Sequence, residues 1–140
     1  MAILALVAVP VLAQAGDSRS VVGEGMASYY SSEFAGSRTA NGERFDPDGM
    51  TAAHRSLAFH SRVAVTNLAN GKSAIVAIHD RGPYVADRIV DLSPKTAADI
   101  GIKHQGVARV EVAPISVPLP NGRLLIGDAG REAGVAVAVR

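Results

Sequence analysis

Residues 63–84 read VAVTNLANGKSAIVAIHDRGPY, and this stretch indicates a β fold. Two short apolar runs, residues 63–66 and 74–78, flank the pair Asn70-Gly71. Asn-Gly tolerates the positive φ angles of a tight hairpin turn. The length of the runs and their β-branched residues are typical of strands. We therefore expect the two runs to be antiparallel neighbours in a sheet.

Further along the chain, strands are expected at residues 88–92 and 107–112. The second alternates apolar with small or charged residues, as a half-buried strand does. Between them the sequence predicts a short helix, which Ser93 caps, Pro94 opens and Gly101 ends. We expect this helix to cover one opening of a small barrel.

The composition describes one small domain with a core of small aliphatic side chains. The chain has 140 residues, of which 4% are aromatic and none is tryptophan, and this suits strands better than a helical bundle. The net charge is +1 and no Lys/Arg cluster is interleaved with aromatic residues, so nucleic acid is not an expected partner. Cysteine is absent, which excludes disulfides, thiolate metal sites and a lipid-anchoring cysteine.

The two ends of the chain differ from its middle. Residues 1–15 form an apolar run that ends in Ala-Gln-Ala, which signal peptidase reads, so we expect export to the periplasm or cell envelope. The run is too short for a membrane span. Residues 16–24 are expected to be a linker and residues 25–115 the folded domain. Residues 116–140 show no sustained period and are expected to be a poorly ordered tail, with an extra strand as the alternative.

Asp80 is the strongest candidate for chemistry. It directly follows an apolar run and precedes Arg81 and a Gly-Pro turn. A carboxylate on such a rigid mount can act as a general acid. The same position is also typical of an aspartate that caps the turn or pairs with Arg81, and the local pattern leaves both interpretations open.

Glu43 and His54 are its candidate companions. Glu43 follows the turn pair Asn41-Gly42 and could face Asp80 across a groove, although a solvated loop carboxylate fits the pattern as well. His54 lies among small residues and could orient a carboxylate or contact a sugar, or it could be a half-buried histidine with satisfied hydrogen bonds.

Other chemistries lack their signatures. The histidines show neither His-x-x-x-His nor His-Glu-x-x-His spacing, so no metal is expected. A serine elbow and the phosphate-binding glycine patterns are absent too, and no cofactor is expected.

Six blocks of the sequence have to be considered together. They are GMASYY (25–30), TANGERF (39–45), TAAHRSL (51–57), VTNL with the following Asn-Gly (65–71), DRGPY (80–84) and IVDLS (89–93). In order and spacing, from about residue 25 to residue 114, they resemble the rare lipoprotein A family of septal lytic transglycosylases. This resemblance implies a mainly β fold, a six-stranded double-psi β-barrel with one or two short helices, which expansins and barwin-like proteins share.

The resemblance also implies an activity. The family cleaves the glycan strand of peptidoglycan, with a preference for strands stripped of their peptides. Asp80 occupies the position of the catalytic acid, and Glu43 and His54 line the same groove. We hypothesise that Asp80 protonates the glycosidic oxygen between N-acetylmuramic acid and N-acetylglucosamine and then accepts a proton from the C6 hydroxyl, which leaves 1,6-anhydro ends.

Two alternatives to this activity are kept. The first is a non-catalytic, expansin-like module that binds glycan without cleaving it. The second is hydrolysis, for which Glu43 is the candidate base that would activate water.

The expected partner is the peptidoglycan glycan strand, and the protein is expected to be a monomer. Further residues of the resembling blocks are expected to bind the sugar. These residues are Tyr30, Thr39, Asn41, Arg81 and Tyr84. The chain departs from the family at His79, where asparagine is usual, and this places a titratable group next to Asp80. Alternation along the strand can direct the His79 side chain away from Asp80.

Overall fold

The structure is a computed structural model that describes residues 23–127. The expected leader at residues 1–15, most of the expected linker and the last part of the expected tail lie outside the described residues. Within residues 23–127, none of the helices has the length and apolar character needed to cross a membrane.

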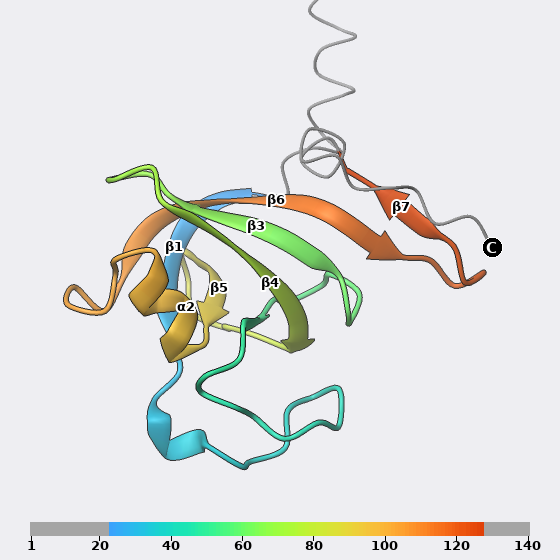
Figure 1. Ribbon diagram of the computed structural model, residues 1–140, viewed down its shortest axis with the longest axis horizontal. Helices are drawn as coiled ribbons and strands as arrows, with labels where there is room; N and C mark the ends of the chain where they lie inside the picture. The colour runs from blue at the N-terminus through green and yellow to red at the C-terminus, as the bar shows by residue number, and fades with distance from the viewer. Residues whose placement is uncertain (1–22, 128–140) are drawn as a thin grey trace, which may run out of the picture.

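Six strands close into a barrel, whose arrangement can be followed in Figure 1. They are β1 (Gly23–Tyr29), β2 (Thr51–Ala53), β3 (Arg62–Asn67), β4 (Ser73–Asp80), β5 (Arg88–Leu92) and β6 (Ala108–Pro118). Their order is β1-β5-β2-β4-β3-β6, and the ring closes because β6 also pairs with β1. The β1–β5 and β2–β4 pairs are parallel, and the other pairs of the ring are antiparallel. The prediction of a mainly β, six-stranded barrel is confirmed.

Strands β3 and β4 form the expected antiparallel hairpin, in which Val63 pairs with Val76. Gly71 in the connecting turn has a φ of 76°, the conformation for which glycine is suited. The buried side chain of Asn67 at the end of β3 donates a hydrogen bond of 2.8 Å to the carbonyl of Ile100. This bond joins the hairpin to the segment that follows the helix.

The barrel interior is filled by aliphatic side chains that alternate along the strands. Ile78 of β4, Val65 of β3, Leu92 of β5 and Val110 of β6 have no exposed surface. Burial of each such side chain contributes about 1.5–3 kcal/mol to folding. The absence of large aromatic residues from this cluster agrees with the composition of the chain.

The expected helix is α2 (Pro94–Asp99), and a 3-10 turn, η1 (Ser32–Phe34), follows β1. Ser93 caps α2 through its side-chain oxygen, which accepts a hydrogen bond from the Thr96 amide. Ala97 and Ile100 are fully buried against the barrel. The helix thus packs over one side of the barrel, as Figure 1 shows.

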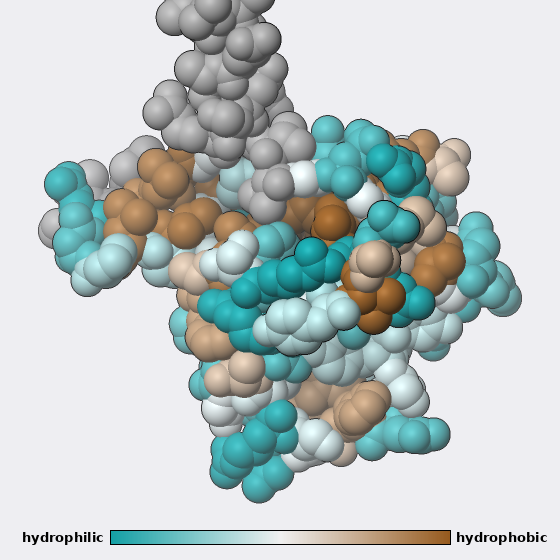
Figure 2. All heavy atoms as spheres, turned by 180° about the vertical axis from the view of Figure 1, so that it is seen from behind, coloured by the Kyte–Doolittle hydropathy of each residue, from teal (hydrophilic) through white to brown (hydrophobic). Residues whose placement is uncertain are grey.

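The segment after residue 115 differs from the expected loose tail. Strand β6 continues to Pro118, and β7 (Leu124–Ile126) returns antiparallel to it, so that Ser116 pairs with Ile126 outside the closed ring. The extra-strand alternative describes this part of the chain. A strand of only three residues is too short to produce a recognisable sequence period. The reverse face of the molecule carries apolar colouring at this end, where Leu124 and Leu125 are exposed (Figure 2).

Candidate active site

Asp80 is the last residue of β4, and its side chain is half-buried. One carboxylate oxygen, Oδ1, accepts hydrogen bonds from the backbone amides of Ala40 (2.8 Å) and Arg81 (2.9 Å). The other oxygen, Oδ2, accepts a hydrogen bond from the Tyr30 hydroxyl. Three donors from three segments of the chain therefore hold this carboxylate in one orientation.

The two carboxylate oxygens of Asp80 differ in the number of hydrogen-bond acceptor positions that remain free. Each carboxylate oxygen has two acceptor positions, so the two amides fill Oδ1, whereas the hydroxyl fills only half of Oδ2. Burial and the hydrogen bond to Asp80 raise the pKa of Tyr30 above its ordinary value. Tyr30 therefore keeps its proton and acts as a donor. Oδ2 is the oxygen that is free to exchange a proton with a ligand.

Tyr30 is itself fixed by aromatic neighbours. Its ring stacks on Phe45, with ring centroids 4.8 Å apart, and meets the edge of Phe34 at 6.1 Å. Phe45 is buried. The hydroxyl thus reaches Asp80 from a ring that has little freedom to move.

The loop of residues 39–43 packs against the end of β4. The backbone amide of Asn41 donates a hydrogen bond to the His79 carbonyl (3.1 Å). This bond lies next to the one from the backbone amide of Ala40 to the Asp80 carboxylate. Within the loop, the Asn41 side-chain oxygen accepts hydrogen bonds from the Thr39 hydroxyl and the Glu43 amide. The side chains of Thr39 and Asn41, expected to bind sugar, thus also stabilise the loop that delivers Glu43 to the site.

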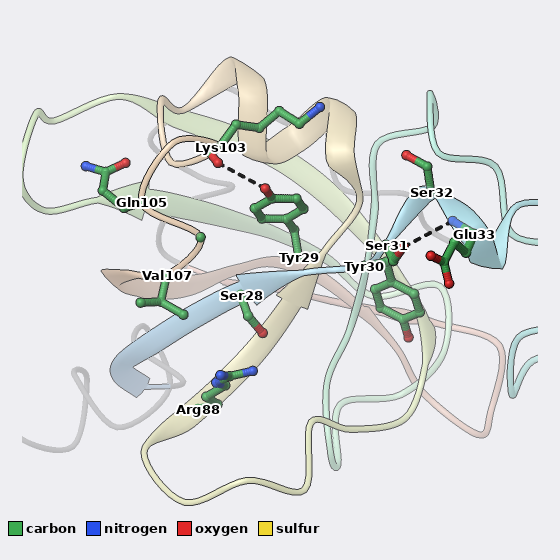
Figure 3. Close-up of a pocket in the computed structure, with 11 residues that line it drawn as sticks. Ser28, Tyr29, Tyr30, Ser31, Ser32, Glu33, Arg88, Lys103, Gln105 and Val107 are labelled. Atoms are coloured by element: carbon green, nitrogen blue, oxygen red, sulfur yellow. Dashed lines mark hydrogen bonds between the residues drawn. The ribbon is translucent and has the colours of Figure 1, made fainter.

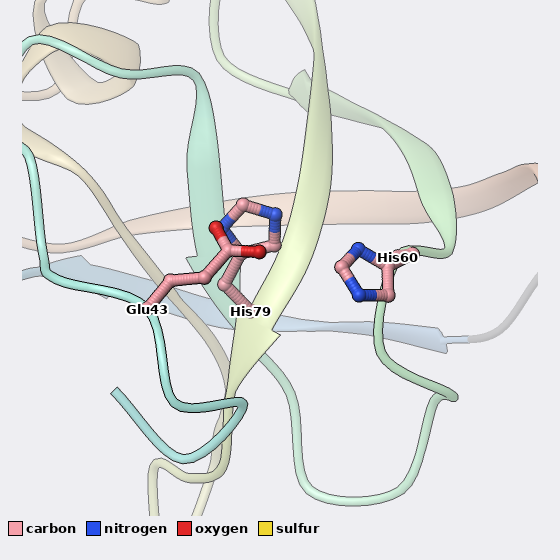
Figure 4. A group of neighbouring side chains, drawn as sticks. All are labelled: Glu43, His60 and His79. Atoms are coloured by element: carbon pink, nitrogen blue, oxygen red, sulfur yellow. The ribbon is translucent and has the colours of Figure 1, made fainter. Parts of the chain in front are cut away.

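The Glu43 carboxylate contacts His79, with 3.4 Å between Oε1 and Nδ1. The His60 ring faces the His79 ring at 5.6 Å between centroids, in an edge-on arrangement (Figure 4). Glu43, His60 and His79 place one ligand atom each within 4.8 Å of one another. No local spacing in the sequence indicates this cluster, because its members come from three separate segments.

His54 lies directly after β2, and its backbone amide donates to the Asp80 carbonyl (3.1 Å). Its side chain is 8% exposed, and Nδ1 accepts hydrogen bonds from the amides of Ser56 and Leu57 (3.1 Å each). Burial, together with the charges of Arg81 and Arg55, lowers the pKa of His54. The ring is therefore a neutral acceptor that orders its own loop beside Asp80.

Two arginines tie the loops around Asp80 together. Arg81 donates to the carbonyls of His54 (3.2 Å) and Leu57 (2.8 Å), and its guanidinium lies 4.0 Å from the centre of the Phe59 ring. Arg55 donates to the carbonyls of Pro83, Val85 and Arg88. Arg81 thus already has protein partners.

Tyr84 lies in the segment that Arg55 holds, and its side chain is 77% exposed. A ring with this exposure is free to contact a ligand, which is compatible with its predicted part in sugar binding.

Asp91 is a residue of this site that the sequence interpretation did not single out. It lies on β5, where it pairs with Ala53 of β2, and Ala53 also pairs with Asp80 on the other side. Its Oδ1 accepts a hydrogen bond of 2.8 Å from the hydroxyl of Ser28. Burial raises the pKa of Asp91, and the charge of Asp80 adds to this rise, while Ser28 and Arg88 oppose it. The burial of Asp91 and the second carboxylate across β2 are properties that only the fold reveals.

An open depression lies beside this group of residues (Figure 3). Its volume is about 710 Å³, and it is lined by polar side chains that include Tyr30, Glu33, Arg88 and Gln105. Asp80 itself lines a much smaller cavity of about 10 Å³, which is about the size of one water molecule. Tyr30 lines both the depression and the small cavity, and its hydroxyl contacts Asp80.

The sequence is similar to several proteins that share one name. The chain is 50% identical over 99 residues to "Endolytic peptidoglycan transglycosylase RlpA" of Pseudomonas aeruginosa, a match that covers 71% of this chain and 29% of the relative. The proteins of that name from Vibrio cholerae and Neisseria meningitidis are 47% and 46% identical, over 69% and 65% of this chain. These matches cover 36% and 38% of the two relatives, so the chain spans well under half of each relative's length.

Solved structures with little sequence similarity share the fold. A Streptomyces papain inhibitor superposes with a TM-score of 0.53 at 19% identity, covering 66% of this chain and 94% of the inhibitor. An expansin of Clavibacter michiganensis superposes with a TM-score of 0.52 at 17% identity, covering 66% of this chain and 49% of the expansin. These likenesses support the predicted double-psi β-barrel.

The profile of the family described as "Lytic transglycolase" matches residues 22–112, which include all six strands of the barrel up to the middle of β6. The match includes Tyr30, Glu43, His54, Asp80 and Asp91. The resemblance inferred from the six sequence blocks is thereby confirmed, and the chain belongs to the lytic transglycolase family.

Proposed function

We propose that this protein is an endolytic peptidoglycan lytic transglycosylase that cleaves between N-acetylmuramic acid and N-acetylglucosamine and leaves 1,6-anhydro ends. The observation that carries the proposal is the half-buried carboxylate of Asp80, held by three hydrogen-bond donors with one acceptor position free on Oδ2. The relatives named as peptidoglycan transglycosylases support the same reaction class.

In the proposed reaction, protonated Asp80 gives its proton to the glycosidic oxygen as the bond to the muramic C1 breaks. The C6 hydroxyl oxygen of the same muramic residue then bonds to C1, and its proton returns to Asp80. The carboxyl is restored and no water is consumed. One carboxyl is therefore sufficient, whereas a hydrolase needs a second group to activate water or to form a covalent intermediate.

The surroundings of Asp80 suit this exchange. Tyr30 holds its own proton, so the proton that moves is the one on the carboxyl. The amides of Ala40 and Arg81 keep Oδ1 fixed, which leaves Oδ2 to face the reacting oxygens. A fixed acid loses little entropy when the transition state forms.

The other predicted site residues are proposed to bind and orient the glycan. Glu43 has a side chain that is 52% exposed and therefore accessible to a sugar hydroxyl. His54 orders the loop beside Asp80, and Tyr84 offers an exposed ring face. The polar lining of the neighbouring depression suits a hydroxyl-rich polymer, because each sugar hydroxyl needs a hydrogen-bond partner when it leaves water.

The substrate implies where the protein acts. Peptidoglycan lies outside the cytoplasmic membrane, so we infer an extracytoplasmic location, with the leader at residues 1–15 as the export signal. Peptide-free strands are the proposed substrate and the protein is proposed to act as a monomer.

Mass spectrometry of the soluble products from peptide-stripped sacculi tests the proposal. The proposed enzyme releases glycan fragments that end in 1,6-anhydro-N-acetylmuramic acid. Fragments with reducing muramic ends would instead indicate hydrolysis. If the protein sediments with the sacculi and releases nothing, it is a glycan-binding module of the expansin kind and the enzymatic proposal is overturned.

A further inference from the structure

Glu43, His60 and His79 form a cluster that the proposed reaction does not use as a unit. One carboxylate oxygen and one nitrogen from each imidazole lie within 4.8 Å of one another. Figure 4 shows the Glu43 carboxylate against the His79 ring, with the His60 ring on the connection beside β4. His60 lies outside the six blocks that resemble the family, and His79 replaces the usual asparagine.

The segments that carry the three residues are all hydrogen-bonded to, or part of, one stretch of β4. His79 belongs to that strand, and the His60 amide donates to the carbonyl of its neighbour Ile78 (2.8 Å). The loop that carries Glu43 is joined to the strand by the bond from the Asn41 amide to the His79 carbonyl (3.1 Å). The three ligand atoms are therefore brought together before any ligand arrives, and only side-chain torsions need to adjust.

The donor set selects a class of ion. Two imidazole nitrogens and one carboxylate oxygen suit borderline transition metals such as Zn²⁺, whereas Ca²⁺ and Mg²⁺ prefer sites made of oxygens. The His79 side chain is 22% exposed and that of Glu43 is 52% exposed, so solvent reaches the cluster. A tetrahedral ion with three protein ligands would keep its fourth position for water or a ligand.

We propose that Glu43, His60 and His79 bind one divalent transition-metal ion of the Zn²⁺ class at the edge of the Asp80 site. Without a metal, Glu43 and His79 form an ion pair only when the imidazole is protonated. A metal ion would instead bridge the carboxylate and both neutral rings. The expectation that no metal binds rested on spacing along the chain, and spacing does not detect ligands from separate segments.

Isothermal titration calorimetry of the full chain tests this proposal with Zn²⁺ alone. The protein is purified without a histidine tag, stripped with EDTA and dialysed. One ion is expected to bind per chain. His79→Asn and His60→Asn are each expected to weaken binding by at least about tenfold, since the loss of a supporting residue alone costs that much. Asparagine suits position 60 because the His60 φ is 72°, a conformation that asparagine tolerates.

His104→Ala is the matched control. His104 is exposed and lies outside the cluster, so its removal should leave the affinity unchanged. Thermal melting shows whether each variant is folded. The wild-type protein supplies an independent readout, since Zn²⁺ should shift the NMR signals of the His60 and His79 rings and not those of His104.

The proposal is overturned if no saturable binding occurs, or if both asparagine variants bind Zn²⁺ as tightly as the wild type. Shifts confined to His54 or His104 would also contradict it. No glycan is present in these measurements, so their outcome is separate from the outcome of the cleavage assay.

Discussion

The ends of β4 and β5 each carry an aspartate, and Ala53 of β2 pairs with both. At the end of β4, Asp80 receives two backbone amides and a hydroxyl. On β5, Asp91 receives one hydroxyl, and burial raises its pKa. Two carboxyls on neighbouring parts of one sheet therefore have different environments, and these environments rather than residue type assign their roles.

The difference also indicates why Asp80 is the proposed reacting group. Its carboxylate is oriented by donors and has a free acceptor position near the small cavity that it lines. Asp91 is oriented by Ser28, and burial together with the charge of Asp80 raises its pKa. We therefore interpret Asp91 as a residue that supports the sheet beside the site through its bond to Ser28 and does not touch the reacting atoms.

Asp80→Asn should have the largest effect. The amide keeps the size of the side chain and cannot donate and recover the proton, so release of soluble glycan from peptide-stripped sacculi should fall by about 10²–10⁴-fold. The control is Asp99→Asn on α2, which removes an exposed aspartate that pairs with Lys95. Full activity of Asp80→Asn would remove Asp80 from the mechanism and end the contrast with Asp91.

Tyr30→Phe tests the hydroxyl group that donates a hydrogen bond to Asp80. The change keeps the stacking on Phe45 and removes the donor to Oδ2, which should lower activity by about tenfold and stability by about 1 kcal/mol. Tyr29→Phe is the matched control, because the Tyr29 hydroxyl donates to the Lys103 carbonyl instead. Glycan release from sacculi measures the activity, and urea denaturation measures the stability. Equal losses in the two variants would show that the contact with Asp80 is unimportant.

Asp91→Asn tests how the second carboxyl, Asp91, affects the pH dependence of the free energy of unfolding. Because the folded-state pKa of Asp91 is raised, its contribution to stability is fully present below its ordinary pKa of 3.8 and is lost as pH rises through the folded pKa. The asparagine still accepts the hydrogen bond from Ser28 and carries no charge.

Urea denaturation should therefore show Asp91→Asn as more stable than the wild type at pH 7, with the advantage shrinking as pH falls toward 3.8. A variant that is less stable at every pH would mean that the ionised form of Asp91 stabilises the fold.

His54→Asn should have the smallest effect. The folded-state pKa of His54 is lowered, so its contribution to stability is present above its ordinary pKa of 6.5 and is lost as pH falls through the folded pKa. An asparagine oxygen can replace Nδ1 as the acceptor for the Ser56 and Leu57 amides.

Melting temperatures measured from pH 7 down to pH 5 check this. The wild type should lose stability over that range and the variant should lose less. Parallel curves for the two proteins would indicate that His54 does not titrate differently in the folded and unfolded states.

Much of the fold could be predicted because its signals are local. Asn70-Gly71 indicates the β3–β4 hairpin, and Ser93 with Gly101 bounds α2, and the structure confirms both. Strand β7 could be predicted only as an alternative. Its pairing with β6 depends on contacts in the folded chain, and three residues are too few to form a recognisable strand pattern.

The candidate site divides in the same way. Asp80 could be singled out because its strand and the following Gly-Pro turn are adjacent in the sequence. The burial of Asp91 and its bond to Ser28, 63 residues away, exist only in the folded chain. The proximity of His60 to His79 likewise arises from the return of the chain beside β4.

Digestion of peptide-stripped sacculi in H₂¹⁸O identifies the nucleophile, because in the proposed reaction the substrate's own hydroxyl, and not water, completes the reaction at Asp80. We expect muramic ends in the 1,6-anhydro form without any heavy oxygen. Reducing muramic ends that carry one heavy oxygen would show that water is the nucleophile, and would contradict the single-carboxyl mechanism.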